Sequence, residues 1–184
     1  MDQDRSRNDQ PPPYAEYARL AEARITAGYG IPVVTRDIPD PLTGDLDGAE
    51  IHIDYAVTPE QRLFLLAHLF GHTVQWNKRA DALEIGQLHK PPVESERLAM
   101  VLDYEREAAE FALTLLHEAG VLAADQWLSD YSGADLAYLR HYYVTGERRP
   151  FSSFRVHGGP MLAAKPIPPF TPSRKVFRMD GIVI

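Results

Sequence analysis

The stretch LFLLAHLFGHTVQW, residues 63–76, is the longest apolar run of the chain and contains two histidines. Its apolar residues fall on almost every side of a helix, which predicts a helix in the centre of the domain. His68 and His72 are four residues apart, so their side chains lie on one helix face with Cβ atoms about 5–6 Å apart. Two imidazoles placed in this way can bind a single metal ion.

The same pair has a simpler interpretation, in which both histidines are core residues that hydrogen-bond to backbone carbonyls or water. The spacing is nevertheless that of the HExxH zinc helix, whose glutamate is the general base of a metallopeptidase. Here the sequence reads HLFGH, and Leu69 occupies the position of that glutamate. The pattern therefore predicts the metal-binding half of the motif without its catalytic half.

The segment TPEQ, residues 58–61, predicts where this helix begins. Threonine as N-cap, proline at the first helical position and glutamine three residues after the cap form a capping box. The helix is expected to end near Asn77. Within it, Gly71 would permit close approach of a second helix, and Gln75 lies where it could hydrogen-bond a metal ligand such as His72.

A third ligand is predicted on the helix that begins near Pro92 and continues to about Gly120. A zinc site needs at least three protein ligands, and a chain without cysteine must supply His, Asp or Glu. At about 100° per residue, Glu105 lies in the middle of an apolar stripe that faces the core. The stripe consists of Leu98, Val101, Leu102, Ala108, Ala109, Ala112 and Leu116. A carboxylate there needs a partner, and a cation held by His68 and His72 would serve.

Other partners for Glu105 are open at this point. Arg62 or Arg97 could form a buried ion pair with it, and no metal would then be needed. Glu107, the nearest other carboxylate, points about 160° away from Glu105 and is therefore a poor replacement for the missing base. The candidate metal ligands are His68, His72 and Glu105.

The remaining pattern predicts an α+β fold that is mainly helical. Residues 13–30 have helical spacing and end in glycine. Residues 31–38 and 49–57 are rich in β-branched residues, and the turn-rich DPLTGDLDG joins them, so they are expected to pair as a small antiparallel sheet. Two shorter helices are expected at residues 124–131 and 133–147.

The chain has 184 residues, of which 45% are hydrophobic and 24% charged, as in soluble globular domains. Residues 1–12 predict a disordered lead, residues 13–146 the metal-binding domain, and residues 147–184 a basic, proline-rich strap. No run of about 18 apolar residues and no secretory leader is visible. With no cysteine, which fits a reducing compartment, a cytoplasmic location without membrane contact is expected.

Charge is divided unevenly along the chain. The strap carries seven Lys or Arg residues against two acidic ones, so the total of −7 leaves −12 for residues 1–146. An acidic body lacks the clustered cations that bind phosphate, and direct nucleic-acid binding is not expected. The strap is expected to lie in extended form on this body, bordering or covering the metal groove, with apolar anchors at Phe151, Phe154, Phe170 and Phe177.

Residues 49–116 resemble the ImmA/IrrE-type zinc metallopeptidases, a branch of the gluzincin superfamily. The resemblance runs from AEIHIDYAV through FLLAHLFGH to YEREAAEFALTLL. The family pattern is a strand, an HExxH helix and a second helix with a glutamate in a form like E-x-E-A-[N/D]-x-F-A, which here reads EREAAEFA. The resemblance implies a zincin-like fold, zinc as cofactor, and Glu105 as the ligand beside His68 and His72.

Two departures from the family pattern concern activity. Leu69 replaces the glutamate that polarises the zinc-bound water, and Ala109 replaces an Asn or Asp that often partners the ligand glutamate. Loss of a general base usually costs about 10²–10⁴-fold in rate. The expected function is a degenerate, regulatory pseudo-peptidase that acts on a protein partner, by resemblance a helix-turn-helix regulator. The alternatives are an active zinc endopeptidase with a non-standard base and a metal-free structural domain.

Overall fold

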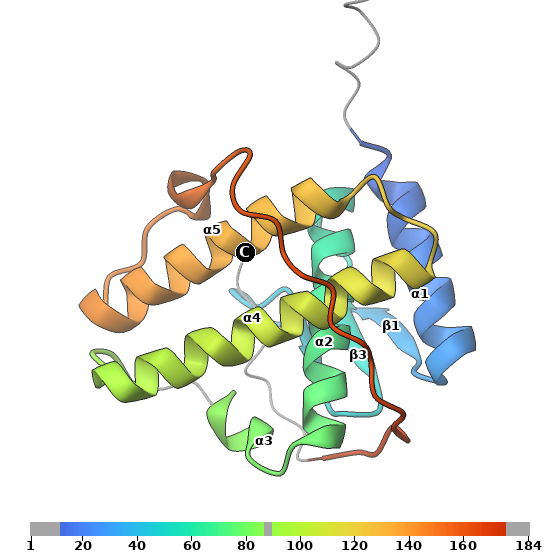
Figure 1. Ribbon diagram of the computed structural model, residues 1–184, viewed down its shortest axis with the longest axis horizontal. Helices are drawn as coiled ribbons and strands as arrows, with labels where there is room; N and C mark the ends of the chain where they lie inside the picture. Colours follow the sequence, from blue (N-terminus) through green and yellow to red (C-terminus); the bar gives the residue numbers. More distant parts are fainter. Residues whose placement is uncertain (1–11, 87–89, 176–184) are drawn as a thin grey trace, which may run out of the picture.

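The computed structural model describes residues 12–86 and 90–175, and it shows an α+β fold that is mainly helical (Figure 1). The predicted lead therefore lies outside the described residues except for residue 12. Within these residues, no helix has both the length and the apolar character needed to cross a membrane. The elements are α1 (Tyr14–Tyr29), β1 (Val33–Arg36), β2 (Gly44–Leu46), β3 (Ile51–Asp54), α2 (Pro59–Lys78), α3 (Ala82–Ile85), α4 (Ser95–Glu118), α5 (Asp125–Thr145) and the 3₁₀ turn η1 (Phe151–Phe154).

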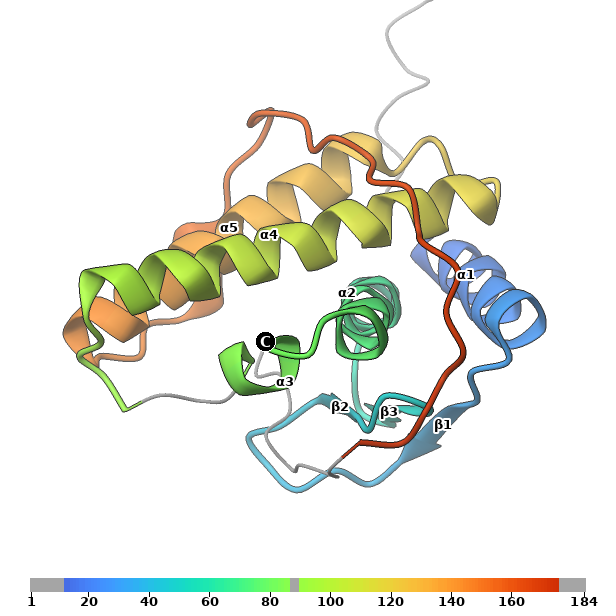
Figure 2. The same ribbon diagram turned by 60° about the horizontal axis from the view of Figure 1, so that its bottom comes forward.

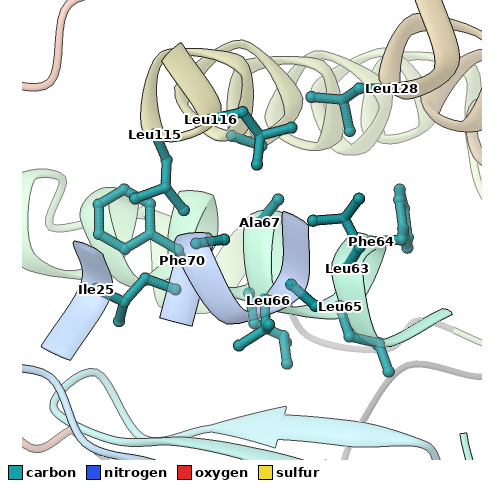
Figure 3. Packing of buried hydrophobic residues seen from close by; sticks show 14 of the residues in the cluster. Ile25, Leu63, Phe64, Leu65, Leu66, Ala67, Phe70, Leu115, Leu116 and Leu128 are labelled. Atoms are coloured by element: carbon teal, nitrogen blue, oxygen red, sulfur yellow. The ribbon is translucent and has the colours of Figure 1, made fainter. Parts of the chain in front are cut away.

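Helix α2 lies at the centre of the fold, as its apolar sequence predicts. Figure 2 looks nearly along its axis, with α4 and α5 above it, α1 beside it and the sheet below. Every residue from 63 to 75 is buried. In Figure 3 its side chains meet Leu115 and Leu116 of α4, Leu128 of α5 and Ile25 of α1. All the other long helices therefore pack on the helix that carries the two histidines.

The predicted start of α2 is confirmed by its capping box. The Thr58 hydroxyl accepts a hydrogen bond from the backbone N–H of Gln61 (3.3 Å), and the Thr58 N–H donates to the Gln61 side-chain oxygen (2.9 Å). The helix ends at Lys78, one residue beyond the expected position. Because capping satisfies backbone donors that lack partners within the helix, it fixes where α2 starts and hence the height of His68 and His72 in the core.

Helices α2 and α4 are in direct backbone contact at Gly71. A Cβ atom added to this glycine would lie 2.1 Å from the backbone oxygen of Ala108. No side chain can occupy that space, so the backbones touch at this point. The predicted role of Gly71 in close helix approach is confirmed.

The sheet is mixed, and the expectation of a small antiparallel sheet is wrong. The strand order is β1-β3-β2, with β1 parallel and β2 antiparallel to β3. The segment expected to be only a turn, DPLTGDLDG, contains β2, which forms the antiparallel partner of β3. Because the chain reverses twice between β1 and β3, these two strands run in the same direction. Residues 51–54 of the central strand are all buried.

Residues 125–145 form one continuous helix, α5, in place of the two shorter helices expected. The expected break was at Gly133, which lies inside the helix. A glycine in a helix costs about 1 kcal/mol relative to alanine, which tertiary packing readily outweighs. The continuous helix places Tyr131, Ser132 and Asp135 on one buried face.

The strap contacts the helical body through aromatic side chains. Phe170 stacks on Tyr29 of α1, with ring centroids 5.8 Å apart, and Phe151 packs on Tyr131 of α5 at 5.2 Å. Phe154 packs against the ring of Tyr138. The fourth predicted anchor, Phe177, lies outside the described residues. Figures 1 and 2 both show the strap crossing the outer side of α4 before it reaches the sheet.

Polar contacts fix the path of the strap. The Lys165 N–H donates to the backbone oxygen of Glu110 on α4 (3.2 Å), and the Thr114 hydroxyl donates to the backbone oxygen of Lys165 (2.7 Å). Arg174 forms an ion pair with Asp47, whose side chain is buried (2.6 Å). The basic strap therefore pairs with acidic residues of the body, as the charge division predicts.

The contact at Gly71 predicts a specific loss of stability. Gly71→Ala forces α2 and α4 apart, and we expect a loss of at least about 3 kcal/mol in the free energy of unfolding, the upper range for overpacking. Gly133→Ala is the matched control, because the nearest atom to its added Cβ is 3.8 Å away. It should be neutral or stabilising by up to about 1 kcal/mol. Urea unfolding of both variants measures the difference; equal effects would contradict the contact.

The strap contacts predict that apolar packing, more than charge, holds the strap. Phe170→Ala should lower the free energy of unfolding by about 1–2 kcal/mol, because a half-buried aromatic ring loses its packing. Met161→Ala is the control, since Met161 is 54% exposed and should change stability by less than about 0.5 kcal/mol. Thermal unfolding at low and high salt should give the same difference. A salt-sensitive loss would show that the ion pairs dominate.

Candidate metal centre

The three predicted ligands converge between α2 and α4. The Nε2 atoms of His68 and His72 are 2.9 Å apart, and Glu105 Oε2 lies 3.3 Å from the first and 3.1 Å from the second. Zinc bound tetrahedrally at about 2.0–2.1 Å places its ligand atoms about 3.3 Å from one another. The three atoms therefore already have nearly the separation that one zinc ion requires, and this buried group could hold a metal ion.

Aromatic rings hold the two imidazoles in place. Phe64 stacks on His68 with ring centroids 5.0 Å apart, and Tyr104 stacks on His72 at 4.6 Å. The Tyr104 hydroxyl in turn accepts a hydrogen bond from the indole N–H of Trp76 (2.8 Å). The histidine side chains are 5% and 8% exposed. Such rigid, largely dry walls keep the ligand atoms directed at one point.

Gln75 determines the tautomer of His72. Its amide N–H groups donate to the backbone oxygen of Tyr104 and to Glu107, both at 2.8 Å, so its oxygen faces His72 Nδ1 at 2.8 Å. That nitrogen must therefore carry a proton and donate it. In a neutral His72, Nε2 then has a free lone pair directed at Glu105. Two electron-rich atoms at 3.1 Å require a cation or an added proton between them.

The charge of Glu105 points to the same requirement. Burial raises the pKa of this carboxyl, but attraction to His72 and hydrogen bonds from both histidines outweigh burial and hold the pKa well below its usual value. Glu105 is therefore ionised and needs positive charge nearby. The arginine alternatives are not realised, since Arg62 pairs with Glu22 and Arg97 lies near Glu84. Glu105 faces only the histidines among the described charged groups within ion-pair distance.

An outer set of charges supports Gln75. Glu107 accepts hydrogen bonds from Gln75, Arg79 (2.9 Å) and Lys165 of the strap. Burial raises the pKa of Glu107, but these three donors outweigh it and lower the pKa. Its expected direction away from Glu105 is consistent with these contacts. The strap thus borders the site through Lys165, Glu107 and Gln75.

Leu69 cannot take part in proton transfer, and its surroundings are apolar. It is 1% exposed and lies next to Leu65 beneath β2, where a Cβ added at Gly44 would be 3.0 Å from Leu69 Cδ1. Ala109, the other departure from the family pattern, is also buried. No general base stands at either of these positions.

The sequence interpretation missed one residue near the site, Asp135 of α5. Its side chain is buried, and burial raises the pKa of its carboxyl to about 7, with the charge of His68 lowering and that of Glu105 raising it. The signal was available, because Asp135 lies seven residues after Leu128 on the buried face of the helix. The sequence interpretation placed a helix break at Gly133, so Leu128 and Asp135 were assigned to two separate helices and their shared face was not recognised.

A third buried histidine, His52 of β3, does not form such a group with the described residues. Its Nδ1 faces Asp45 at 2.8 Å and its Nε2 faces Glu50 at 2.6 Å. The two carboxylates therefore lie on opposite sides of the ring and do not share one ligand atom. His52 therefore bridges two carboxylates at the sheet, whereas the ligand atoms of His68, His72 and Glu105 meet at one point.

Comparison of the chain with protein-family models, curated proteins and solved structures finds no match in any of the three. Its function is therefore inferred from the chemistry of the residues in this site.

The raised pKa of Asp135 predicts how the stability of the metal-free protein depends on pH. Below about pH 4 the carboxyl is protonated in both states. As the pH rises to about 7, the unfolded chain loses the proton while the folded chain keeps it, so folding becomes less favourable. Asp135→Asn removes this penalty and should stabilise the protein by on the order of 2–4 kcal/mol at pH 8, with no gain at pH 4.

Urea unfolding between pH 4 and pH 8 in the presence of a chelator measures this difference. Asp103→Asn is the matched control, because the Asp103 side chain is 73% exposed on α4. Its effect should be small at every pH. A gain from Asp135→Asn that is independent of pH would contradict the raised pKa.

Proposed function

We propose that the protein binds one zinc ion through His68, His72 and Glu105. The observation that carries this proposal is the convergence of three ligand atoms within 2.9–3.3 Å, together with the His72 tautomer that Gln75 imposes. Metal-free alternatives leave an ionised, buried carboxylate facing a nitrogen lone pair, unless a histidine is protonated. A divalent cation satisfies all three atoms at once.

The donor set favours zinc over hard cations. Magnesium and calcium prefer six or more oxygen ligands, whereas this group offers two imidazole nitrogens and one carboxylate oxygen. Two histidines and a glutamate with room for a water molecule form a catalytic type of zinc site, in contrast to closed four-ligand structural sites. When bound in such a site, zinc supplies Lewis-acid chemistry, lowering the pKa of a water and polarising a carbonyl.

We further propose, on the resemblance to ImmA/IrrE-type metallopeptidases, that the protein is a degenerate, regulatory member that acts on a protein partner. Leu69 supports this role, because the position that carries the base in that family is apolar and buried here. By the same resemblance, the partner would be a helix-turn-helix regulator. Binding a partner requires the scaffold and does not require a base.

A second candidate function is an active zinc-dependent peptidase with a non-standard base. Buried Asp135 on α5 is the observation that favours it, because this carboxyl interacts with the charges of His68 and Glu105. The two candidates share the zinc site and differ only in whether a proton acceptor stands beside it.

The zinc proposal predicts close to one zinc per chain in protein purified without chelator or nickel resin. Replacing any one ligand, by His68→Ala, His72→Ala or Glu105→Ala, should lower occupancy sharply, since a three-ligand site loses most of its affinity with one ligand. His117→Ala is the control, because this half-buried histidine near the C-terminal end of α4 pairs with Asp125 at the start of α5. Elemental analysis of the folded variants gives the metal content. Wild-type protein that stays metal-free in added zinc would refute the proposal.

A further inference from the structure

Asp135 belongs to a face of α5 that packs on the histidine face of α2. Tyr131 stacks on Phe64, with ring centroids 4.1 Å apart and ring planes at 24°. Phe64 in turn stacks on the ring of His68, with centroids 5.0 Å apart. Asp135 lies four residues after Tyr131 on the same buried face of α5, so it stands one helical turn from this stack of three rings beside the candidate metal centre.

The carboxyl of Asp135 has no partner among residues 12–86 and 90–175. It is 7% exposed, and no hydrogen bond or ion pair joins it to any residue that the structure describes. Ser132, one turn earlier on the same face, has a buried hydroxyl that also lacks a hydrogen-bond partner among the described residues. Buried polar groups without protein partners are commonly satisfied by water. Two such groups on one buried face of α5 indicate a place for water there.

The separation of Asp135 from the ligands distinguishes two roles. A fourth direct ligand would lie about 3.3 Å from the other ligand atoms. Asp135 is not part of the group whose ligand atoms all lie within 4.8 Å of one another, and it forms no ion pair with His68 within 4.0 Å. Its charge nevertheless interacts with those of His68 and Glu105. The carboxyl is thus not one of the atoms that could share the ion, and its role beside the site would be to act on a water molecule.

We propose that Asp135 is the general base of this site and replaces the glutamate whose position Leu69 occupies. The proposal rests on the proposed zinc site and specifies the second candidate function, hydrolysis of a peptide or amide bond. The base comes from a different helix than in the HExxH arrangement, in which it stands beside the first histidine on the metal-binding helix.

The proton steps balance with water as the only co-reactant. The Asp135 carboxylate accepts a proton from the attacking water, whose oxygen forms a bond to the carbonyl carbon of the substrate. The carbon–nitrogen bond then breaks, and the Asp135 carboxyl gives the proton to the leaving nitrogen. The products are a carboxylic acid and an amine, and Asp135 is again a carboxylate.

Other carboxylates near the site are not available for this role. Glu105 is a ligand in the proposed site, and Glu107 is engaged by Gln75, Arg79 and Lys165. Burial raises the pKa of Asp135 to about 7, near the operating pH of a good acid–base group. A group in this pKa range can both accept and return a proton at neutral pH.

The test uses acetohydroxamic acid, a small metal ligand, and needs no knowledge of the substrate. It binds metals as its anion, so its hydroxyl proton must be removed, and a carboxylate beside the ion can accept this proton and return it as a hydrogen bond to the bound anion. Full-length protein is loaded with Co²⁺ in place of zinc, and visible absorption reports the binding of first the metal and then acetohydroxamate. Asp135→Asn should keep its Co²⁺ affinity but bind acetohydroxamate about 10- to 100-fold more weakly at pH 7, the effect of one lost charge-assisted hydrogen bond.

Asp103→Asn is the charge-matched control and should leave both affinities unchanged. If Asp135→Asn binds acetohydroxamate as tightly as wild type, Asp135 is a structural residue and the proposal is overturned. If it loses Co²⁺ as strongly as His68→Ala, Asp135 is a ligand, which also overturns the proposal. Failure of the zinc site itself is seen separately, because wild type then takes up no Co²⁺. Circular dichroism checks folding, and Asp135→Ala provides the same test if the asparagine variant does not fold.

Discussion

Helices α2 and α4 touch backbone to backbone at Gly71, and the candidate metal centre depends on this contact. Gly71 stands directly before His72, and the backbone it meets, at Ala108, is one turn after Glu105. A side chain at position 71 would separate the helices and move the glutamate away from both imidazoles. A single missing Cβ therefore permits ligand atoms on two helices to come within 3.3 Å of each other.

Around this contact, a series of hydrogen bonds connects the proposed metal ligand His72 to the strap. His72 is held by Gln75, which is held by Glu107, which binds Lys165 of the strap. Burying a carboxylate such as Glu105 is costly unless positive charge compensates it, and the histidines alone do so only when one is protonated. The same network that is costly without a cation becomes favourable when a divalent ion completes it. We regard this as the strongest physical support for the proposed zinc site.

A carboxylate can act as a general base when it lies next to the attacking water molecule. It does not matter which helix carries the carboxylate. In the HExxH arrangement the base directly follows the first histidine. Here Leu69 occupies that position and packs beneath β2. Asp135 approaches from α5, on a face fixed by the stacking of Tyr131 on Phe64. Loss of the usual glutamate and gain of a carboxylate elsewhere would leave a hydrolytic site with changed geometry. The same Leu69 is also compatible with a protein that binds a partner without cutting it.

The sequence by itself determined the central helix, its capped start and the face on which His68 and His72 lie, because these depend on local spacing and hydrogen bonds within a few residues. It also indicated Glu105, since a charged residue inside an apolar stripe is visible from periodicity. Only the tertiary structure decided the parallel pairing of β1 with β3, the continuity of α5 through Gly133 and the burial of Asp135 one turn from the stacked rings of Tyr131, Phe64 and His68. These features depend on contacts between segments far apart in the chain, and such contacts override local signals like a glycine or a turn-rich loop.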